Sequence, residues 1–577
     1  MPETPLSEAA ARLHGFDDFV RAIMQEWKVQ GLAIAIVKDD EVLLARGFGL
    51  RDVDSKQEVT ARTLFPIASC TKAFTTASLS ILADEGKLDW DAPVRTYLPA
   101  FKLYDAFTTE HITPRDLVTH RTGLPRHDLM WYNSTATRQE LFERLQYLEP
   151  TKDLRALWQY QNLMYMVAGY LAGEVSGASW EDVVQTRIFD RLAMGSSNFS
   201  IVKTVQEASD FSHPYKEEKD EVKEIPFYAA QGAIAPAGAI VSSVADMANW
   251  LRMHLKRGKY GTEQVISASQ VAQLHAPQMI MPESSKFPET PYTSYAMGWF
   301  VEPYRGYSML YHGGNIDGFS SLTSLFPREN IGVVVLTNMS ASSVPEILTY
   351  NIFERLLDLD QVPWSERMMK EHLEIKEAGE KGKEKSASDR VPATSPSHPL
   401  AAYTGDFEHP GYGVISVTLD GEQLQGTFNN MQFPLTHYHY DIFELKIERF
   451  DIDLKVSFTA NVKGDIDTLI APFEVTASDI VFKRVPSKQM QIRSFLEPFA
   501  GEYTLMGESL IVALKGESTL FVSVPGQPDY ELTPYKGTEF HVRNLSGFSI
   551  EFKRDASNAV TEAILTQPHG MFTAKRT

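Results

Sequence analysis

Apolar residues recur along this 577-residue chain with two different periods. From about residue 70 to 255 most apolar positions follow a helical repeat, and strand patterns lie on either side of this stretch. From residue 399 onward, short segments alternate apolar and polar positions, which is typical of antiparallel strands. We therefore predict an α+β domain followed by an all-β region.

The first domain is expected to build its sheet from both of its ends. An Asp39-Asp40 turn joins the first two strand patterns into a hairpin, and a helical pattern over 343–358 follows the last strand. The predicted strands are residues 32–37, 42–45, 318–325 and 331–336. The pattern predicts an antiparallel sheet flanked by helices, with a helical subdomain inserted between the strands.

Composition marks the boundary between the two regions. Residues 366–398 are charged and then rich in Ser, Pro and Ala, which is typical of a linker, and a short helix could open it. We assign 1–365 to the first domain and 399–577 to an antiparallel barrel or two related half-barrels. The second interpretation rests on a weak internal repeat around Gly405 and Gly501, because both precede two strand patterns with a tight turn.

The strongest chemical signal lies where the first helical pattern begins. Ser69 precedes Lys72 by three residues, and positions i and i+3 share one face of a helix. A serine hydroxyl is a weak nucleophile that needs an adjacent base, and a buried lysine can supply one. The same Ser-x-x-Lys pattern recurs at Ser200–Lys203, but β-branched residues after a turn predict an irregular or extended segment there.

Two further motifs follow in order. Tyr160 and Asn162 form the only Tyr-x-Asn in the chain, and His312-Gly313-Gly314-Asn315 lies between two strand patterns. Each motif also has a purely structural interpretation. Asn162 could cap a core helix beside a packed Tyr160, and the paired glycines could form a bulge or turn beside a buried histidine.

The ordered set Ser-x-x-Lys, Tyr-x-Asn and His-x-Gly resembles the serine β-lactamase-like superfamily. The chain looks closest to the group of class C β-lactamases, D-aminopeptidases and esterases, peptidase family S12, over residues 10–360. The supporting segments are 47–49, 63–65, 113–125, 236–247 and 297–300. Residues 403–412 resemble the lipocalin-like C-terminal domain of some relatives, where that domain covers the active site or mediates assembly.

The resemblance implies a role for each motif residue. Ser69 would be acylated, Lys72 would be its base, and Tyr160 would relay protons to the leaving group and to the deacylating nucleophile. Asn162 would hydrogen-bond the acyl side of the substrate.

The His-Gly-Gly-Asn segment would complete the site. The backbone N–H groups of Ser69 and Asn315 would form the oxyanion hole, with Gly313 and Gly314 beside them. His312 stands where many β-lactamases have a lysine that helps to hold a substrate carboxylate. A histidine is mostly neutral at pH 7, so this departure argues against a true β-lactamase and leaves acyl-serine chemistry intact.

Composition excludes several classes of partner. A net charge of -20 and a pI of about 5.3 argue against binding to nucleic acid or an anionic membrane.

The single cysteine, Cys70, excludes an intramolecular disulfide, and we expect it to be a buried filler. We find no signal-peptide or transmembrane pattern, and we expect a cytoplasmic protein. We expect no cofactor and no metal, because the cluster at 437–441 lacks a complete ligand set.

Three functions remain open from the sequence. The first is a serine hydrolase acting on a small-molecule ester, an amide or a short peptide, with Trp131, Tyr132 and Trp299 among its pocket walls. The second is an acyltransferase on the same scaffold. The third is a catalytically silent binding protein on a hydrolase fold. A homo-oligomer formed through the C-terminal domain is also open.

Overall fold

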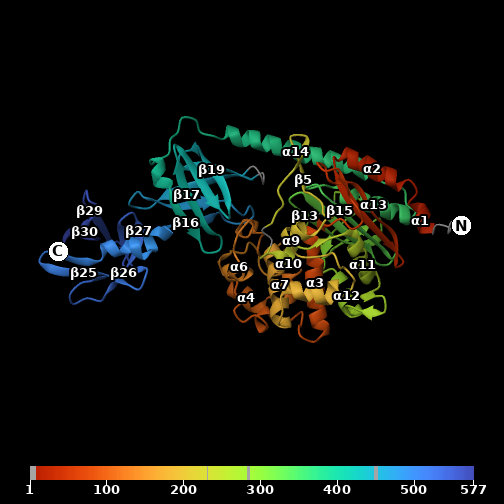
Figure 1. The fold of residues 1–577 in the computed structure, drawn as a ribbon, viewed down its shortest axis with the longest axis horizontal. Helices are drawn as coiled ribbons and strands as arrows, with labels where there is room; N and C mark the ends of the chain where they lie inside the picture. The colour runs from red at the N-terminus through yellow and green to blue at the C-terminus, as the bar shows by residue number, and fades with distance from the viewer. Residues whose placement is uncertain (1–7, 230–231, 283–285, 448–451) are drawn as a thin grey trace. The chain divides into compact units, whose positions relative to one another are not determined.

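The computed structural model describes residues 8–229, 232–282, 286–447 and 452–577 (Figure 1). The chain divides into two compact units. The first contains Met1–Asp389 with Phe473–Ser478, and the second contains Arg390–Pro472 with Asp479–Thr577. The division at 389/390 falls inside the segment 366–398.

An antiparallel sheet forms the centre of the first unit. Over the described residues it has nine strands in the order β10-β11-β12-β13-β14-β15-β1-β2-β3. The strands are β1 Gly31–Lys38, β2 Glu41–Asp52, β3 Gln57–Glu58, β10 Met279–Ile280, β11 Ser294–Tyr295, β12 Phe300–Tyr304, β13 Tyr307–Ile316, β14 Phe319–Phe326 and β15 Ile331–Thr337. The expected hairpin is confirmed, since Asp39 and Asp40 both have positive φ between β1 and β2, as a type I′ turn requires.

Helices cover both faces of this sheet. α2 Phe16–Glu26 and α13 Val344–Leu356 pack on the face that carries Leu32 and Val333. On the opposite face α11 Val244–Leu255 lies so close that a side chain at Gly332 would touch Leu251. β1 and β15 are consequently buried on both faces, which explains their continuous apolar runs.

The remaining helices of this unit lie mainly between β3 and β10. α3 Thr71–Asp84 is the central one, because every residue from Thr71 to Leu82 is buried. The other helices of the unit are α1 Glu8–Arg12, α4 Ala106–His111, α5 Pro114–Leu117, α6 Arg138–Arg144, α7 Asn162–Ser176, α8 Trp180–Val184, α9 Ile201–Glu207, α10 Ala235–Gly238, α12 Ala268–His275 and α14 Trp364–Ser388. Three short strand pairs complete this part: β4 Phe65–Pro66 with β7 Val241–Ser242, β5 Tyr215–Glu218 with β6 Glu221–Glu224, and β8 Lys259–Tyr260 with β9 Glu263–Gln264.

Two expectations about helices were wrong. Residues 201–207 form α9, because the Ser200 hydroxyl accepts the Lys203 backbone N–H and caps the helix despite its β-branched residues. α14 is much longer than the short helix expected at the start of the linker. Glu-Lys pairs four residues apart, such as Glu377 with Lys381 at 2.7 Å, support an exposed helix of this kind.

The second unit contains two closed antiparallel barrels, each with eight strands in the described residues. The expectation of half-barrels was therefore wrong, and each repeat closes on itself. The first barrel contains β16 Gly405–His409, β17 Gly413–Asp420, β18 Gln423–Phe428, β19 Met431–His439, β20 Ile442–Ile447, β21 Ile452–Ala460, β22 Ile466–Ala471 and β23 Ile480–Val485. The second contains β24 Gly501–Leu505, β25 Glu508–Lys515, β26 Thr519–Ser523, β27 Tyr530–Lys536, β28 Glu539–Val542, β29 Ser549–Arg554, β30 Val560–Gln567 and β31 Gly570–Arg576.

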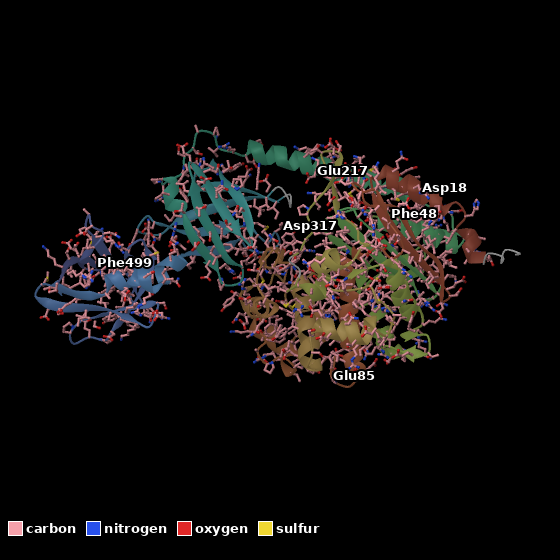
Figure 2. The ribbon with its side chains drawn as sticks, viewed as in Figure 1. Asp18, Phe48, Glu85, Glu217, Asp317 and Phe499 are labelled. Atoms are coloured by element: carbon pink, nitrogen blue, oxygen red, sulfur yellow. The ribbon has the colours of Figure 1, made fainter. Side chains whose placement is uncertain are left out.

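Inward-facing aromatic residues fill these barrels. Phe499, just before β24, is labelled in Figure 2. It is fully buried in the core of the second barrel, together with Tyr503 and Phe552. In the first barrel Tyr403 and Phe407 pack on Phe458. Along β19 buried apolar positions alternate with exposed ones, which matches the wall of a filled barrel.

Candidate active site

Ser69 lies on the short turn of helix that leads into α3. A 3₁₀ turn spans Ala68–Cys70, and α3 begins at Thr71. Ala68 has φ 46°, a left-handed conformation that residues other than glycine rarely adopt. Such strain is concentrated at functional sites. Ser69 is half-buried and lines a pocket, whereas its neighbour Cys70 is buried.

Lys72 reaches Ser69 as the helical spacing predicts. Its Nζ lies 3.0 Å from Ser69 Oγ, 2.8 Å from Asn162 Oδ1 and 2.8 Å from the Ala237 carbonyl oxygen. Burial lowers the pKa of Lys72 well below its usual value, and the positive charge of Arg126 lowers it further. A neutral amine can donate two hydrogens to the two carbonyl-type oxygens and accept the Ser69 hydroxyl hydrogen with its lone pair.

Tyr160 approaches Ser69 from a different segment. Its hydroxyl donates to Ser69 Oγ at 2.8 Å. Burial raises the pKa of Tyr160 far above its usual value, so the phenol keeps its proton at neutral pH. The buried His120 ring packs against Tyr160 with centroids 4.4 Å apart, and His120 Nδ1 accepts the Gln161 backbone N–H at 3.0 Å.

Asn162 is the first residue of α7, and Gln161 provides the cap by accepting the Leu163 backbone N–H. The capping role considered for Asn162 was therefore wrong. The Asn162 amide is held between Lys72 and Asp128, where Nδ2 donates to Oδ1 at 3.1 Å. Asp128 also accepts from Arg126 Nε at 2.6 Å and from Trp131 Nε1 at 3.0 Å.

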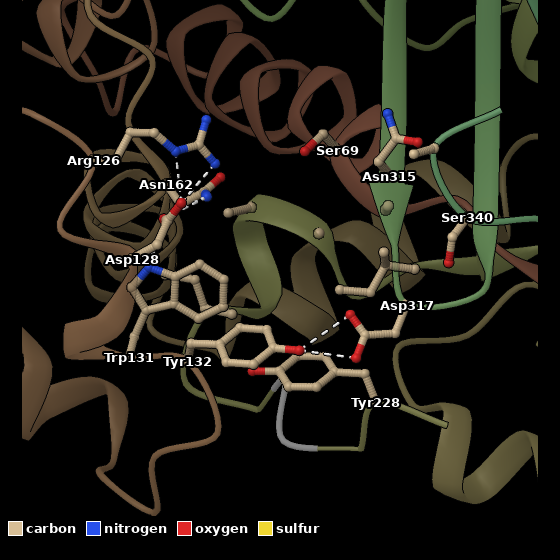
Figure 3. Close-up of a pocket in the computed structure, with 16 residues that line it drawn as sticks. Ser69, Arg126, Asp128, Trp131, Tyr132, Asn162, Tyr228, Asn315, Asp317 and Ser340 are labelled. Carbon is tan, nitrogen blue, oxygen red and sulfur yellow. Dashed lines mark hydrogen bonds and ion pairs between the residues drawn. The ribbon is translucent and has the colours of Figure 1, made fainter. Parts of the chain in front are cut away.

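The His-Gly-Gly-Asn segment lies inside the continuous strand β13, not in a bulge or turn. A Cβ atom at Gly314 would collide with the Ile67 carbonyl oxygen and lie 3.0 Å from Ser69 N. The missing side chain thus lets β13 approach the backbone of Ser69. Gly313 faces away, with its nearest neighbours 3.8 Å from an added Cβ. Asn315 follows on the same strand and lines the pocket beside Ser69 (Figure 3).

His312 occupies a different environment. It is 1 % exposed and does not line the pocket that contains Ser69. Its Nδ1 lies 2.7 Å from the Gly313 carbonyl oxygen and its Nε2 lies 3.0 Å from the Tyr295 hydroxyl. Burial lowers the pKa of His312 to about 3, and Lys72 adds to this effect. A neutral His312 therefore donates from Nδ1 and accepts the Tyr295 hydroxyl.

The pocket beside Ser69 has a volume of about 360 Å³. It is lined by Ala68, Ser69, Arg126, Asp128, Trp131, Tyr132, Asn162, Tyr228, Ile234, Ala237, Gly238, Asn315, Ile316, Asp317, Ser340 and Ala341 (Figure 3). Trp131 and Tyr132 line it as expected. The expectation for Trp299 was wrong, because Trp299 is fully buried beside His254 and His275.

Sequence reasoning missed the charged residues of this pocket. Arg126, Asp128 and Asp317 belong to no motif that marks acyl-serine chemistry. The only signal in the sequence was the charged run Arg126-His127-Asp128, directly after Gly123-Leu124-Pro125. Among the described residues, no group of three or more His, Cys, Asp or Glu side chains is arranged to hold a metal ion.

The Beta-lactamase family matches residues 16–356, so the chain belongs to that family of serine hydrolases. Residues 389–484 match a domain of unknown function, DUF3471. The chain is similar to an unguisins hydrolase from Aspergillus campestris, with 28% identity over 428 residues that cover 71% of this chain and 78% of the relative. A second unguisins hydrolase, from Aspergillus violaceofuscus, is 29% identical over 72% of this chain and 79% of its own length.

Solved structures share the fold. The octameric penicillin-binding protein homologue from Pyrococcus abyssi superposes with a TM-score of 0.54 and 21% identity, over 82% of this chain and all of that one. The D-amino acid amidase from Ochrobactrum anthropi gives a TM-score of 0.50 and 22% identity, over 61% of this chain and 98% of that one.

Within the ranges that the structure describes, helices long and apolar enough to cross a membrane are absent.

Proposed function

We propose that this protein hydrolyses an ester or an amide of a small molecule or short peptide through an acyl-enzyme on Ser69. The observation that carries the proposal is the contact of Ser69 Oγ with Lys72 Nζ at 3.0 Å and with Tyr160 Oη at 2.8 Å. The depressed pKa of Lys72 and the elevated pKa of Tyr160 supply a base and an acid side by side.

In the first half-reaction Lys72 takes the Ser69 hydroxyl proton while Oγ bonds to the substrate carbonyl carbon. Negative charge then develops on the carbonyl oxygen, which the backbone N–H groups of Ser69 and Asn315 would stabilise. Tyr160 gives its proton to the leaving alcohol or amine as the bond to carbon breaks, and the proton on Lys72 restores the phenol.

In the second half-reaction water replaces the leaving group. The oxygen of the water bonds to the acyl carbon, and the neutral Lys72 accepts a proton from this water, either directly or through Tyr160. Collapse of this intermediate releases the carboxylic acid and returns the proton to Ser69. The proposed base is positioned by two acceptor-only contacts, to Asn162 Oδ1 and the Ala237 carbonyl oxygen, which keep its lone pair directed at Ser69.

Two observations favour ester or amide substrates over β-lactam antibiotics. Relatives of this chain are described as hydrolases of unguisins, and a structural neighbour is a D-amino acid amidase. In addition, the buried neutral His312 replaces a lysine that would face a substrate carboxylate, and Arg126 is already paired with Asp128.

The proposal is tested by the intact mass of the protein after exposure to a fluorophosphonate probe. We expect a single adduct on wild type and on Ser200→Ala, and none on Ser69→Ala. Ser200→Ala is a matched control because it removes the serine of the other Ser-x-x-Lys pattern. Turnover of p-nitrophenyl esters and peptide amides would then separate the two substrate classes. A folded wild-type protein that takes no adduct would refute the proposal.

A further inference from the structure

His120 lies shortly after α5, and its backbone has the left-handed φ of 57°. Few residues other than glycine adopt this conformation, although histidine and asparagine do so more often than most. The His120 carbonyl oxygen accepts the Gln159 backbone N–H at 2.8 Å, and the Arg121 carbonyl oxygen accepts the Arg155 backbone N–H at 2.6 Å. The chain around His120 therefore runs beside the segment that leads to Tyr160.

The imidazole of His120 holds the residue on the other side of Tyr160. Its Nδ1 accepts the Gln161 backbone N–H at 3.0 Å. A neutral imidazole accepts with one nitrogen and carries its hydrogen on the other, so this contact requires the Nε2–H tautomer. Burial lowers the pKa of His120 well below its usual value, and the positive charge of Lys72 lowers it further. His120 therefore binds the chain immediately before and immediately after Tyr160.

The His120 ring also supports the ring of Tyr160. The two rings pack with centroids 4.4 Å apart and planes inclined by 35°. The fully buried Tyr165 and Tyr295 pack against the same imidazole at 5.2 Å and 4.6 Å, so the core fixes His120 in turn. The Tyr160 phenol thus rests on an immobile ring while its hydroxyl donates to Ser69 Oγ at 2.8 Å.

We propose that His120 is a positioning residue that aligns the Tyr160 phenol for proton transfer to the leaving group. This inference rests on the proposed hydrolysis at Ser69, which assigns Tyr160 the role of the acid. His120 does not line the pocket beside Ser69, so it acts only through the segment that it holds. Loss of its Nδ1 would leave the buried Gln161 N–H without this acceptor and let the segment shift. Small displacements of a reacting group lower the rate steeply.

Leaving groups of different basicity test the proposal. Two esters with the same acyl group, one of p-nitrophenol and one of methanol, differ in their need for an acid, because p-nitrophenolate leaves without a proton and methoxide does not. The readout is the kcat/KM of the methyl ester divided by that of the p-nitrophenyl ester. Tyr160→Phe should lower this ratio, and we expect His120→Gly to lower it about tenfold. A merely structural loss would lower both values equally and leave the ratio unchanged.

The variants are chosen to separate the acceptor from the backbone conformation. Glycine adopts a positive φ without strain and removes both the ring and the acceptor. Asparagine also tolerates this conformation, and its amide oxygen is as many bonds from Cα as Nδ1 is, so His120→Asn should restore most of the ratio. His254→Leu is the control for loss of a buried histidine, because His254 packs on Trp299 and His275 outside the pocket. A folded His120→Gly with the wild-type ratio, while Tyr160→Phe lowers it, would overturn the proposal.

A second measurement does not depend on the glycine variant. Wild type labelled with ¹⁵N-histidine reports the tautomer of each ring by NMR, and the signal that disappears in His120→Asn belongs to His120. We expect the Nε2–H tautomer at neutral pH, and an Nδ1–H tautomer or a charged ring would refute the positioning role.

Fluorophosphonate labelling separates this inference from the proposed function. A labelled wild type combined with an unchanged ratio in His120→Gly would reject the positioning role alone. A folded wild type that takes no label would reject the hydrolysis itself, and the role of His120 with it.

Discussion

The Asn162 side-chain amide donates Nδ2–H to the carboxylate of Asp128 at 3.1 Å. A carboxylate can only accept hydrogen bonds, so the amide oxygen must be the atom that faces Lys72. Asp128 thereby sets the orientation of Asn162, which in turn holds Lys72 Nζ at 2.8 Å. A residue outside the three motifs thus orients one inside them.

We expect Asp128→Asn to lower the second-order rate constant of fluorophosphonate labelling by about 10- to 100-fold, equivalent to about 1.4–2.8 kcal/mol. The variant loses the acceptor-only partner that orients the Asn162 amide and leaves Arg126 without the charge of Asp128. Asp54→Asn serves as the control for removal of a charge. If labelling of Asp128→Asn matched wild type while both proteins melted at similar temperatures, the positioning role would be excluded.

The two glycines of β13 should respond differently to the same substitution. Gly314→Ala places a methyl group against the Ile67 carbonyl oxygen and pushes β13 away from Ser69. Loss of one oxyanion donor costs about 10²- to 10³-fold in kcat, and we expect a decrease of that size. Gly313→Ala meets nothing closer than 3.8 Å and should keep most of the activity. Equal kcat values for the two variants would argue against this oxyanion hole.

Lys72 should make stability depend on pH. Burial lowers the pKa of Lys72 in the native protein. At pH values between this lowered pKa and the ordinary pKa of lysine, Lys72 is protonated in the unfolded chain and mostly neutral in the native protein. The contribution of Lys72 to stability therefore rises with pH in that window, by at most about 1.4 kcal/mol per pH unit. We expect the free energy of unfolding of wild type, relative to Lys72→Met, to increase with pH above neutrality. Chemical denaturation at several pH values measures this difference, with Lys102→Met at an exposed position as the control.

Glu302 should make the stability of the protein fall as the pH rises, which is opposite to the effect of Lys72 and occurs at lower pH. Burial raises the pKa of Glu302 to about 7, although Thr293 and Tyr311 donate hydrogen bonds to it. The native protein then holds a proton that the unfolded chain releases above about pH 4.3. Stability should fall as the pH rises from there to about 7, and Glu302→Gln should flatten this fall. Melting temperatures across this range check the slope, with the exposed Glu221→Gln as control.

His312→Lys should behave as a structural substitution. The side chain is buried and accepts the Tyr295 hydroxyl, so a lysine removes this acceptor and brings an ammonium group into a buried position. We expect a loss of stability of about 1–3 kcal/mol and no gain with carboxylate-bearing esters. A stable variant that turns over such esters faster than wild type would instead assign His312 to substrate binding.

The sequence by itself determined the elements whose local signals agree. The buried strands 32–37 and 331–336, the Asp-Asp hairpin and the helix after Ser69 all follow from periodicity and turn chemistry. The helical spacing alone predicts the contact of Ser69 with Lys72. Local signals failed at Ser200, where one N-cap outweighed the weak helix propensity of the β-branched residues that follow. They also failed in the second unit, where the strand patterns did not reveal that each repeat closes as a full barrel.

Only the tertiary structure decided the rest of the site. The Tyr160–Asn162 segment and Gly314 lie far from Ser69 in the chain, and their contacts with Ser69 and Lys72 depend on how α3, α7 and β13 pack. The burial that shifts the pKa values of Lys72 and His312 is likewise a property of packing. Arg126, Asp128 and Asp317 belong to no catalytic motif, because a charged residue acquires its role only from the partner that the fold brings to it.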